Sequence, residues 1–182
     1  MRRVETSLPG VFIVEPDVFA DERGFFFESY HREKYRQLGI NDEFVQDNHA
    51  KSQRDTLRGL HYQLRRPQGK LCRVTSGEVL DVAVDIRRSS AQFGRWTAVR
   101  LSAENQRQIY VPVGFAHGYL VLSDTAEFLY KCTDYYDPAD QRSITWDDPE
   151  LAIEWNVATP SLSAKDRQAP RLKQLAAEEL PQ

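Results

Sequence analysis

Short segments in which apolar and polar residues alternate recur through the middle of the chain. In the clearest, residues 79–86, four aliphatic residues at even positions share one face and Asp81 and Asp85 lie on the other. This period of two is that of a β-strand whose faces meet different surroundings. Comparable runs, separated by Gly, Pro, Asp, Ser and Asn, lie at 10–14, 24–30, 96–101, 108–111, 119–122 and 127–133. Evenly spaced short strands are typical of a β-sandwich or β-barrel, so we expect an all-β fold.

Helical patterns are confined to two segments. Residues 31–38 end before Gly39, which suits a left-handed helix cap, and a charged stretch follows at 172–179. We therefore expect a few short peripheral helices. The chain has 182 residues and contains no repeat, linker or low-complexity segment, which favours one domain over residues 1–182.

The charge balance bears on the class of ligand. Lys and Arg number 24 against 27 Asp and Glu, a formal net charge of −3, and the basic residues are scattered. Nucleic-acid-binding proteins carry a basic surface or stripe. We therefore expect no nucleic-acid partner, whereas a small phosphorylated ligand is compatible with this composition.

The N-terminal residues and the cysteines indicate the compartment. Residues 1–6 lead into Pro9-Gly10 without the apolar stretch of a signal peptide, and no run approaches membrane-spanning length. Cys72 and Cys132 stand singly among apolar and β-branched neighbours, without C-x-x-C spacing. Such cysteines are typical of reduced core thiols. We expect a cytoplasmic protein with no membrane partner.

One histidine lies in a strand-like segment with cationic flanks. Residues 57–63 read Leu-Arg-Gly-Leu-His-Tyr-Gln, and Gln-Gly-Lys follows at 68–70. A neutral imidazole near fixed positive charge suits proton removal from a carbon acid, because the cation stabilises the negative charge that develops. The alternative is that His61 is a hydrogen-bonded residue of a sheet interior, and this segment alone does not choose between the two.

A second motif indicates a barrel with an open mouth. Residues 112–118 contain the spacing P-x-G-x-x-H and resemble the second sequence motif of the cupin superfamily of jelly-roll barrels. Metal-binding cupins also have an H-x-H pair on an earlier strand, and the corresponding place here reads His61-Tyr62-Gln63. A transition-metal site would lack ligands, so we expect no metal and disfavour a metal-dependent cupin oxygenase. As an alternative to a role in the barrel mouth, His117 could fasten a turn.

Several ordered segments together resemble one family, the dTDP-4-dehydrorhamnose 3,5-epimerases of deoxysugar nucleotide biosynthesis. The resemblance covers about residues 10–166 and is carried by the segments 21–28, 44–48, 57–63, 68–70, 77–85, 112–118, 130–134 and 162–166. It implies a cupin-type jelly roll, no cofactor, a dTDP-sugar substrate, and a homodimer in which an N-terminal strand contributes across the interface.

The resemblance also implies a catalytic set. His61 matches the family's proton acceptor, and Asp166 matches the acid that orients and supports it. Lys70 matches the cation beside the developing enolate oxygen. Tyr130 matches the proton donor on the opposite face of the sugar, which inversion requires. Taken singly, Tyr130 could be core aromatic surface, Lys70 a solvated turn residue and Asp166 a helix cap.

Nucleotide recognition is implied at further positions. By resemblance, the cations near the diphosphate are Arg23, Arg58 and Lys165, with His117 as a further candidate. Polar contacts to the ligand are implied at Glu28, Gln46 and Asn48. Tyr136 matches an aromatic position that stacks on thymine, and Phe25 is an added candidate for that face. Gln141 departs from the family, which commonly has Glu nearby, and we assign it no role.

Two rival functions remain at this level. A related enzyme that inverts only C3 or only C5 would keep the same base and donor, because the placement of the donor decides the outcome. A non-catalytic nucleotide-sugar-binding barrel would be expected to have lost one of the four catalytic residues, and all four are present: His61, Lys70, Tyr130 and Asp166.

Overall fold

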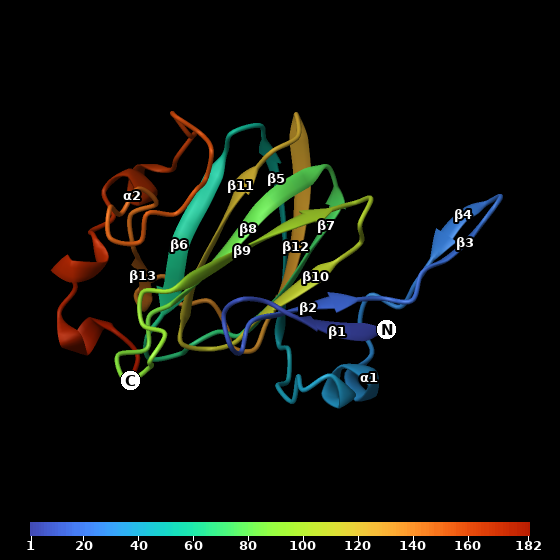
Figure 1. The fold of residues 1–182 in the computed structure, drawn as a ribbon, viewed down its shortest axis with the longest axis horizontal. Coiled ribbons are helices and arrows are strands. Elements are labelled where there is room, and N and C mark those ends of the chain that lie inside the picture. Colours follow the sequence, from blue (N-terminus) through green and yellow to red (C-terminus); the bar gives the residue numbers. More distant parts are fainter.

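The computed structural model describes residues 1–182 and consists mainly of two antiparallel sheets that face each other (Figure 1). The first sheet has the order β1 (Arg2–Glu5), β2 (Phe12–Glu15), β10 (Gln108–Val111), β7 (Lys70–Ser76), β12 (Thr125–Cys132), β5 (Gln46–Gln53). The second has the order β13 (Gln141–Ser143), β6 (Leu57–Gln63), β11 (Phe115–Val121), β8 (Glu78–Asp85), β9 (Trp96–Ser102). The expected all-β, cupin-type fold is confirmed.

Three apolar clusters explain why both faces of some strands are buried. One fills the space between the sheets and includes Cys72, Ala83 and Phe128. Another packs the outer face of the second sheet against the C-terminal part of the chain, so the even positions of β8 are also covered. The third lies on the outer face of the first sheet near Tyr35 of α1 (Arg32–Gln37). Odd and even positions of residues 79–86 therefore face two different buried regions, and the odd positions Asp81 and Asp85 point between the sheets.

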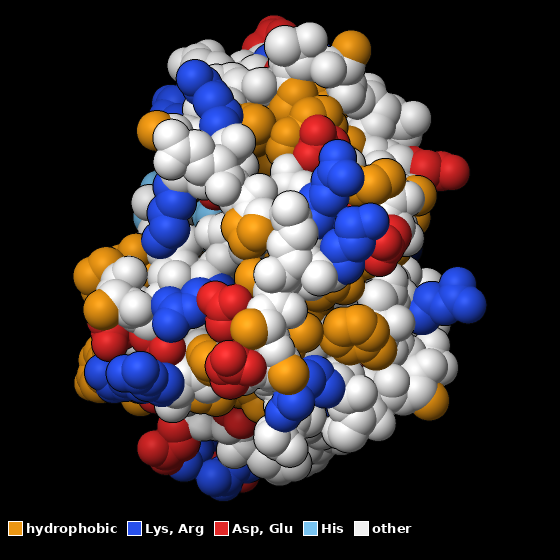
Figure 2. All heavy atoms as spheres, turned by 90° about the vertical axis from the view of Figure 1, so that its left-hand side faces the viewer, with side chains coloured by type: hydrophobic (Ala, Val, Ile, Leu, Met, Phe, Trp, Pro, Cys, Tyr) orange, Lys and Arg blue, Asp and Glu red, His pale blue; other side chains and the backbone are white.

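The C-terminal part of the chain contains little regular structure. It includes the short helix α2 (Ala164–Arg167) and two 3₁₀ turns, η1 (Leu172–Gln174) and η2 (Ala177–Glu179). Figure 2 looks onto this side of the molecule, where basic and acidic side chains are interspersed among hydrophobic ones. No helix in the structure is long and apolar enough to span a membrane.

A hairpin of β3 (Phe19–Asp21) and β4 (Gly24–Phe26) projects away from the two sheets (Figure 1). We call residues 18–28 the arm. Its strands pair with each other and with neither of the large sheets. Apolar side chains remain exposed along it: Phe19, Phe25 and Phe26 are 67%, 61% and 65% accessible.

Some predicted boundaries require correction. The strand at 24–30 ends at Phe26, the strand at 10–14 runs from Phe12 to Glu15, and the strand at 119–122 begins already at Phe115. His117 is therefore a buried strand residue, and its interpretation as a turn residue is wrong. The stretch 172–179 forms two 3₁₀ turns rather than one helix, because Ala176 between them is extended.

Candidate active site

A cavity of about 660 Å³ opens between the two sheets near one end of the sandwich. Its walls come from β5, β6, β7, β11 and β12, and one rim comes from residues 161–166. Predicted site residues that line it are Gln46, Asn48, Arg58, His61, Lys70, His117, Tyr130, Tyr136, Lys165 and Asp166. The sheets therefore gather residues that are up to 120 positions apart in the chain, from Gln46 to Asp166.

His61 and Asp166 form a close pair at the edge of this cavity. The Nε2 atom of His61 lies 2.6 Å from Oδ1 of Asp166. The carboxylate side chain is only 4% exposed, whereas the imidazole is 28% exposed and lines the cavity. Because Nε2 is engaged, Nδ1 is the ring nitrogen left for exchange of a proton with a ligand.

The short helix α2 fixes the carboxylate. Ser163 caps the helix by accepting a hydrogen bond from the backbone N–H of Asp166 at 3.1 Å, and its hydroxyl donates to Oδ2 of Asp166 at 2.9 Å. Burial alone would raise the pKa of Asp166, but the hydrogen bond and charge of His61, together with Ser163, lower it below its ordinary value. The carboxylate therefore stays ionised and can support a protonated imidazole.

A second histidine–aspartate pair lies deeper in the cavity. His117 is the cross-strand neighbour of His61 on β11, and its Nε2 atom lies 2.9 and 3.0 Å from the two oxygens of buried Asp81 on β8. The sequence motif identified His117 but gave no signal for Asp81 as its partner. The two imidazoles thus stand side by side, each held by a different carboxylate.

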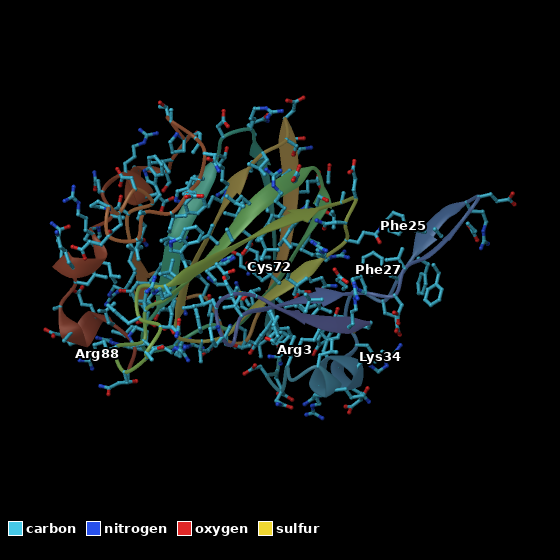
Figure 3. The ribbon with its side chains drawn as sticks, viewed as in Figure 1. Arg3, Phe25, Phe27, Lys34, Cys72 and Arg88 are labelled. Atoms are coloured by element: carbon cyan, nitrogen blue, oxygen red, sulfur yellow. The ribbon has the colours of Figure 1, made fainter.

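One group of side chains is close enough to share a metal ion. Ligand atoms of Cys72, Asp81 and His117 lie within 4.8 Å of one another, and all three residues are buried. Burial raises the pKa of the Cys72 thiol well above its ordinary value, so the thiolate form that binds metals is disfavoured there. Figure 3 shows Cys72 in the middle of the sandwich. The metal-free site expected from the sequence stays a prediction.

The opposite wall of the cavity carries Tyr130 and Lys70. Tyr130 lies on β12 and Lys70 begins β7, both in the first sheet, whereas His61 lies in the second. The Tyr130 ring packs against Phe128, 5.8 Å between ring centroids. Burial raises the pKa of the Tyr130 phenol, so the hydroxyl keeps its proton. A basic group and a proton donor therefore face the same space from two different sheets.

Polar side chains of β5 line the floor near Tyr130. Gln46 donates from Nε2 to Oδ1 of Asn48 at 2.9 Å, and Oε1 of Gln46 accepts from the backbone N–H of Tyr136 at 2.9 Å. Tyr136 is exposed at the rim, where its hydroxyl donates to Oε1 of Gln141 at 2.7 Å. Gln141, to which the sequence assigned no role, lines the cavity.

The loop that carries Tyr136 is anchored by Gln63 of β6. Its amide donates to the backbone carbonyls of Arg66 and Tyr135 at 2.7 and 3.2 Å, and it accepts from the backbone N–H of Asp137 at 2.8 Å. The amide thus fastens the rim to the second sheet. Sequence reasoning also assigned no role to four further lining residues, namely Gln63, Gln68, Tyr119 and Ser163.

Three predicted residues, Arg23, Phe25 and Glu28, do not line the cavity of their own chain. They lie on the arm, and Figure 3 shows Phe25 outside the sandwich. Arg23 pairs with Asp21 at 2.5 Å, and Glu28 pairs with Lys34 of α1. Within one chain, the structure therefore separates them from His61 and Tyr130.

Comparisons with known proteins agree on one family. The family model described as dTDP-4-dehydrorhamnose 3,5-epimerase matches residues 5–174. The chain is 56% identical to the dTDP-4-dehydrorhamnose 3,5-epimerase of Pseudomonas aeruginosa, over 92% of this chain and 94% of that protein.

Solved structures of the same family have the same fold. A dTDP-6-deoxy-D-glucose-3,5-epimerase from Legionella pneumophila, solved in complex with dTDP-4-keto-L-rhamnose, superposes with a TM-score of 0.97 at 51% identity, covering 100% of this chain and 97% of that one. A 3′-monoepimerase from Streptomyces bikiniensis, in complex with dTDP-quinovose, gives a TM-score of 0.89 at 37% identity, covering 96% of this chain and 90% of that one.

Proposed function

The chain belongs to the dTDP-4-dehydrorhamnose 3,5-epimerase family, and we propose that the cavity between its sheets is where the reaction takes place. The enzyme converts dTDP-4-dehydro-6-deoxy-D-glucose into dTDP-4-dehydro-L-rhamnose, by inversion at C3 and C5. The 4-carbonyl of this sugar acidifies the hydrogens on both neighbouring carbons. One enolate-stabilising site can therefore serve both centres.

His61 is the base in this proposal. Its pairing with Asp166 at 2.6 Å holds the ring with one nitrogen towards the cavity and stabilises the imidazolium formed when a proton is taken from carbon. Lys70 supplies the positive charge beside the enolate oxygen, because an ammonium in a partly enclosed site stabilises charge that develops during the reaction. No cofactor or metal takes part.

Tyr130 is the proton donor. Inversion requires that the proton leave from one face of the sugar and return to the other, so the base and the acid must approach from opposite sides. The observation that carries the proposal is that His61 and Tyr130 line one cavity from different sheets. The enolate is a strong enough base to take a proton from a phenol whose pKa is raised.

The nucleotide is held by the remaining lining residues. Arg58, Lys165 and His117 bind the diphosphate, and Gln46 and Asn48 contact polar groups of the ligand. Tyr136, exposed at the rim, stacks on the thymine. Both cysteines are free and buried, which is compatible with a reducing compartment, and we assign the reaction to the cytoplasm.

The arm completes the cavity of a second copy of the chain. We assign the enzyme as a homodimer because the arm exposes three phenylalanines away from its own sheets, and such exposed apolar side chains are stabilised by burial in an interface. Arg23, Phe25 and Glu28 then contribute to the partner's ligand site. Nucleic acid has no part in this proposal.

Solvent-exchange measurements test the reaction assignment. In D₂O with a chelator present, the wild-type enzyme should introduce deuterium at both C3 and C5 of the keto sugar. His61→Asn should stop exchange at both centres, because one base serves both abstractions. Exchange at only one carbon in the wild type would indicate a monoepimerase, and normal exchange at either carbon in the variant would require a second base. Chelator inhibition reversed by a divalent metal would contradict the metal-free mechanism.

Mixing two inactive variants tests the arm. Arg23→Ala damages an arm and His61→Asn damages a cavity, so a mixed dimer retains one undamaged arm facing one undamaged cavity. If arms act across the interface, equal amounts of the two variants refolded together should recover about a quarter of the wild-type activity. Half of the dimers then contain one chain of each variant, and each of these mixed dimers has one complete site out of two. Mixing without subunit exchange is the control. Absence of recovery, with dimers present by ultracentrifugation, would restrict the arm to its own chain.

A further inference from the structure

One serine holds an arginine across the mouth of the cavity. Arg58 lies on β6 of the second sheet and Ser52 on β5 of the first. Two nitrogens of the guanidinium, Nε and Nη2, donate to the same oxygen, Oγ of Ser52, each at 3.1 Å. Ser52 is buried, whereas Arg58 lines the cavity and is exposed. A hydroxyl of one sheet thus fixes the orientation of a cation on the other.

The chemical nature of this partner matters for anion binding. Other arginines of the chain, such as Arg66 and Arg87, are paired with carboxylates at 2.5 Å. Arg58 is held only by a neutral hydroxyl. A carboxylate would compete with a phosphate for the guanidinium, but a hydroxyl orients the group without neutralising it. The guanidinium of Arg58 therefore keeps its full positive charge, and its remaining N–H groups can bind a ligand.

The hydrogen-bonding capacity of the Ser52 hydroxyl indicates that a third residue takes part. A serine hydroxyl has two lone pairs and one proton. Both lone pairs of Ser52 serve Arg58, so its proton needs an acceptor elsewhere. The hydroxyl of Tyr119 is buried, lines the same cavity and has no hydrogen-bond partner of normal geometry. Its ring is fixed by stacking on Phe128, with 4.1 Å between centroids.

The surroundings of Tyr119 agree with this assignment. Tyr119 is the cross-strand neighbour of Arg58. Burial raises the pKa of its phenol, and Arg58 and Ser52 both act in the opposite direction. The net shift is upwards, so the phenol stays neutral. With the Ser52 proton directed at the Tyr119 oxygen, the Tyr119 proton remains available to a bound anion.

We propose that Ser52 is a positioning residue that aims the Arg58 guanidinium at the diphosphate of the nucleotide sugar, and that the Tyr119 hydroxyl fixes the orientation of Ser52. This inference rests on the assignment of Arg58 to the diphosphate in the proposed function. Ser52 acts through Arg58, so its removal should weaken phosphate recognition and leave recognition of the nucleoside unchanged.

Calorimetric binding of dTDP and of thymidine to the full-length enzyme tests the proposal. Ser52→Ala should weaken dTDP binding about tenfold, as expected for a lost hydrogen-bond partner of a charged group, with thymidine binding unchanged. In turnover, KM should rise more than kcat falls. Ser52→Thr, which keeps the oxygen, should restore most of the affinity. Tyr119→Phe should produce a smaller loss of dTDP affinity than Ser52→Ala.

A double-mutant cycle with Arg58→Ala separates positioning from a general structural effect. If Ser52 acts only through Arg58, Ser52→Ala should have no further effect on dTDP affinity in the Arg58→Ala background. The matched control is Ser143→Ala: Ser143 is 8% exposed, like Ser52 at 6%, and its hydroxyl has no hydrogen-bond partner. This control should bind dTDP as the wild type does. Ser52→Cys, nearly equal in volume but a poor acceptor, replaces Ser52→Ala if the latter misfolds.

The outcomes distinguish the inference from the function on which it rests. Wild-type dTDP affinity in folded Ser52→Ala, or an equal loss in the presence and absence of Arg58, would overturn the role of Ser52. Equal losses for thymidine and dTDP would also overturn it, because they indicate general damage to the cavity. If Arg58→Ala itself weakens both ligands equally, the assignment of Arg58 to the diphosphate fails instead.

Discussion

At the scale of single residues, the cavity assigns different tasks to chemically similar groups by their surroundings. His61 and His117 are cross-strand neighbours, but His61 pairs with Asp166 at the solvent-accessible edge and His117 with Asp81 in the buried interior. The exposed imidazole can exchange protons with ligand and water, and the buried one is fixed by both carboxylate oxygens of its partner. His61 is therefore the better placed of the two to act as a base, whereas His117 lines the cavity in a fixed orientation that suits binding.

Tyr130 separates inversion from simple enolisation. His61 can remove a proton and return deuterium to the same face, which labels the sugar without changing its configuration. Tyr130→Phe deletes the phenolic proton and keeps the ring that packs on Phe128. We expect this variant to retain solvent exchange in at least one position and to lose epimer formation by about 10²-fold or more. Chiral analysis of the product, beside deuterium content by mass spectrometry, measures both. A folded variant that forms the inverted sugar at the normal rate would assign the donation to another acid or to water.

The sequence predicted the catalytic residues of the site but not the residues that position them. The four catalytic candidates were identified because they belong to motifs, and all four line one cavity. Ser52, Gln63 and Tyr119 were assigned no role, because each acquires one only through the neighbours that the folded chain brings to it. The partners of Arg58 and Tyr136 depend on the pairing of the two sheets, which periodicity does not specify.

At the scale of elements, hydrophobic alternation identified the cavity-lining strand β12 at 127–133 but missed β5, which lines the cavity with polar side chains. Residues 108–111 were predicted with the correct bounds and are buried throughout. The eight residues of β5, Gln46–Gln53, were not predicted, because their inward positions carry Gln46, Asn48 and Ser52. A strand whose inner face meets a polar cavity loses the apolar signature of a strand.

Two glycines permit the close approach of β6 and β11. A Cβ atom at Gly59 would lie 2.6 Å from Cα of Gly118 and 2.8 Å from the carbonyl oxygen of His117. Gly59 also has φ +127°, a conformation that side chains rarely adopt. Gly24 of the arm has nearly the same φ, +126°, with nothing within 4 Å of its Cβ position. A comparison of Gly59 with Gly24 therefore separates the cost of backbone strain from the cost of steric overlap.

We expect Gly59→Ala to destabilise the protein more than Gly24→Ala. Backbone strain, on the order of 1–3 kcal/mol, is common to both variants, and overlap with β11 adds about 1–3 kcal/mol for Gly59 alone. Urea unfolding followed by circular dichroism, at one protein concentration, gives the free energy of unfolding for each. Equal losses would mean that β11 yields to the added methyl group without cost.

At the scale of the whole molecule, buried carboxylates tie the second sheet to the loops and the short helix beside it. Asp85 accepts from Arg87 and Ser90, Asp140 accepts from the backbone N–H groups of Arg65 and Arg66, and Asp166 accepts from His61 and Ser163. Burial by itself raises the pKa of each carboxyl, but these donors outweigh it and lower all three pKa values. Ionised carboxylates thus stabilise the fold at several separate places.

These lowered pKa values predict acid sensitivity. Below the ordinary aspartate pKa, about 3.9, the unfolded chain binds protons that the folded protein does not yet accept, so protonation favours unfolding. The contribution is fully present above about pH 5 and is lost as pH falls through the lowered folded pKa values. We therefore expect a nearly constant urea midpoint from pH 7 to about 5 and a steep decrease below about pH 4.

Asp85→Asn should lower the free energy of unfolding at pH 7 and also reduce the slope of stability against pH below about pH 4, because one of the linked protonations is gone. Glu104→Gln, on an exposed turn, is the control and should leave the slope unchanged. An unaltered slope in folded Asp85→Asn would remove Asp85 from the groups that make the fold sensitive to acid.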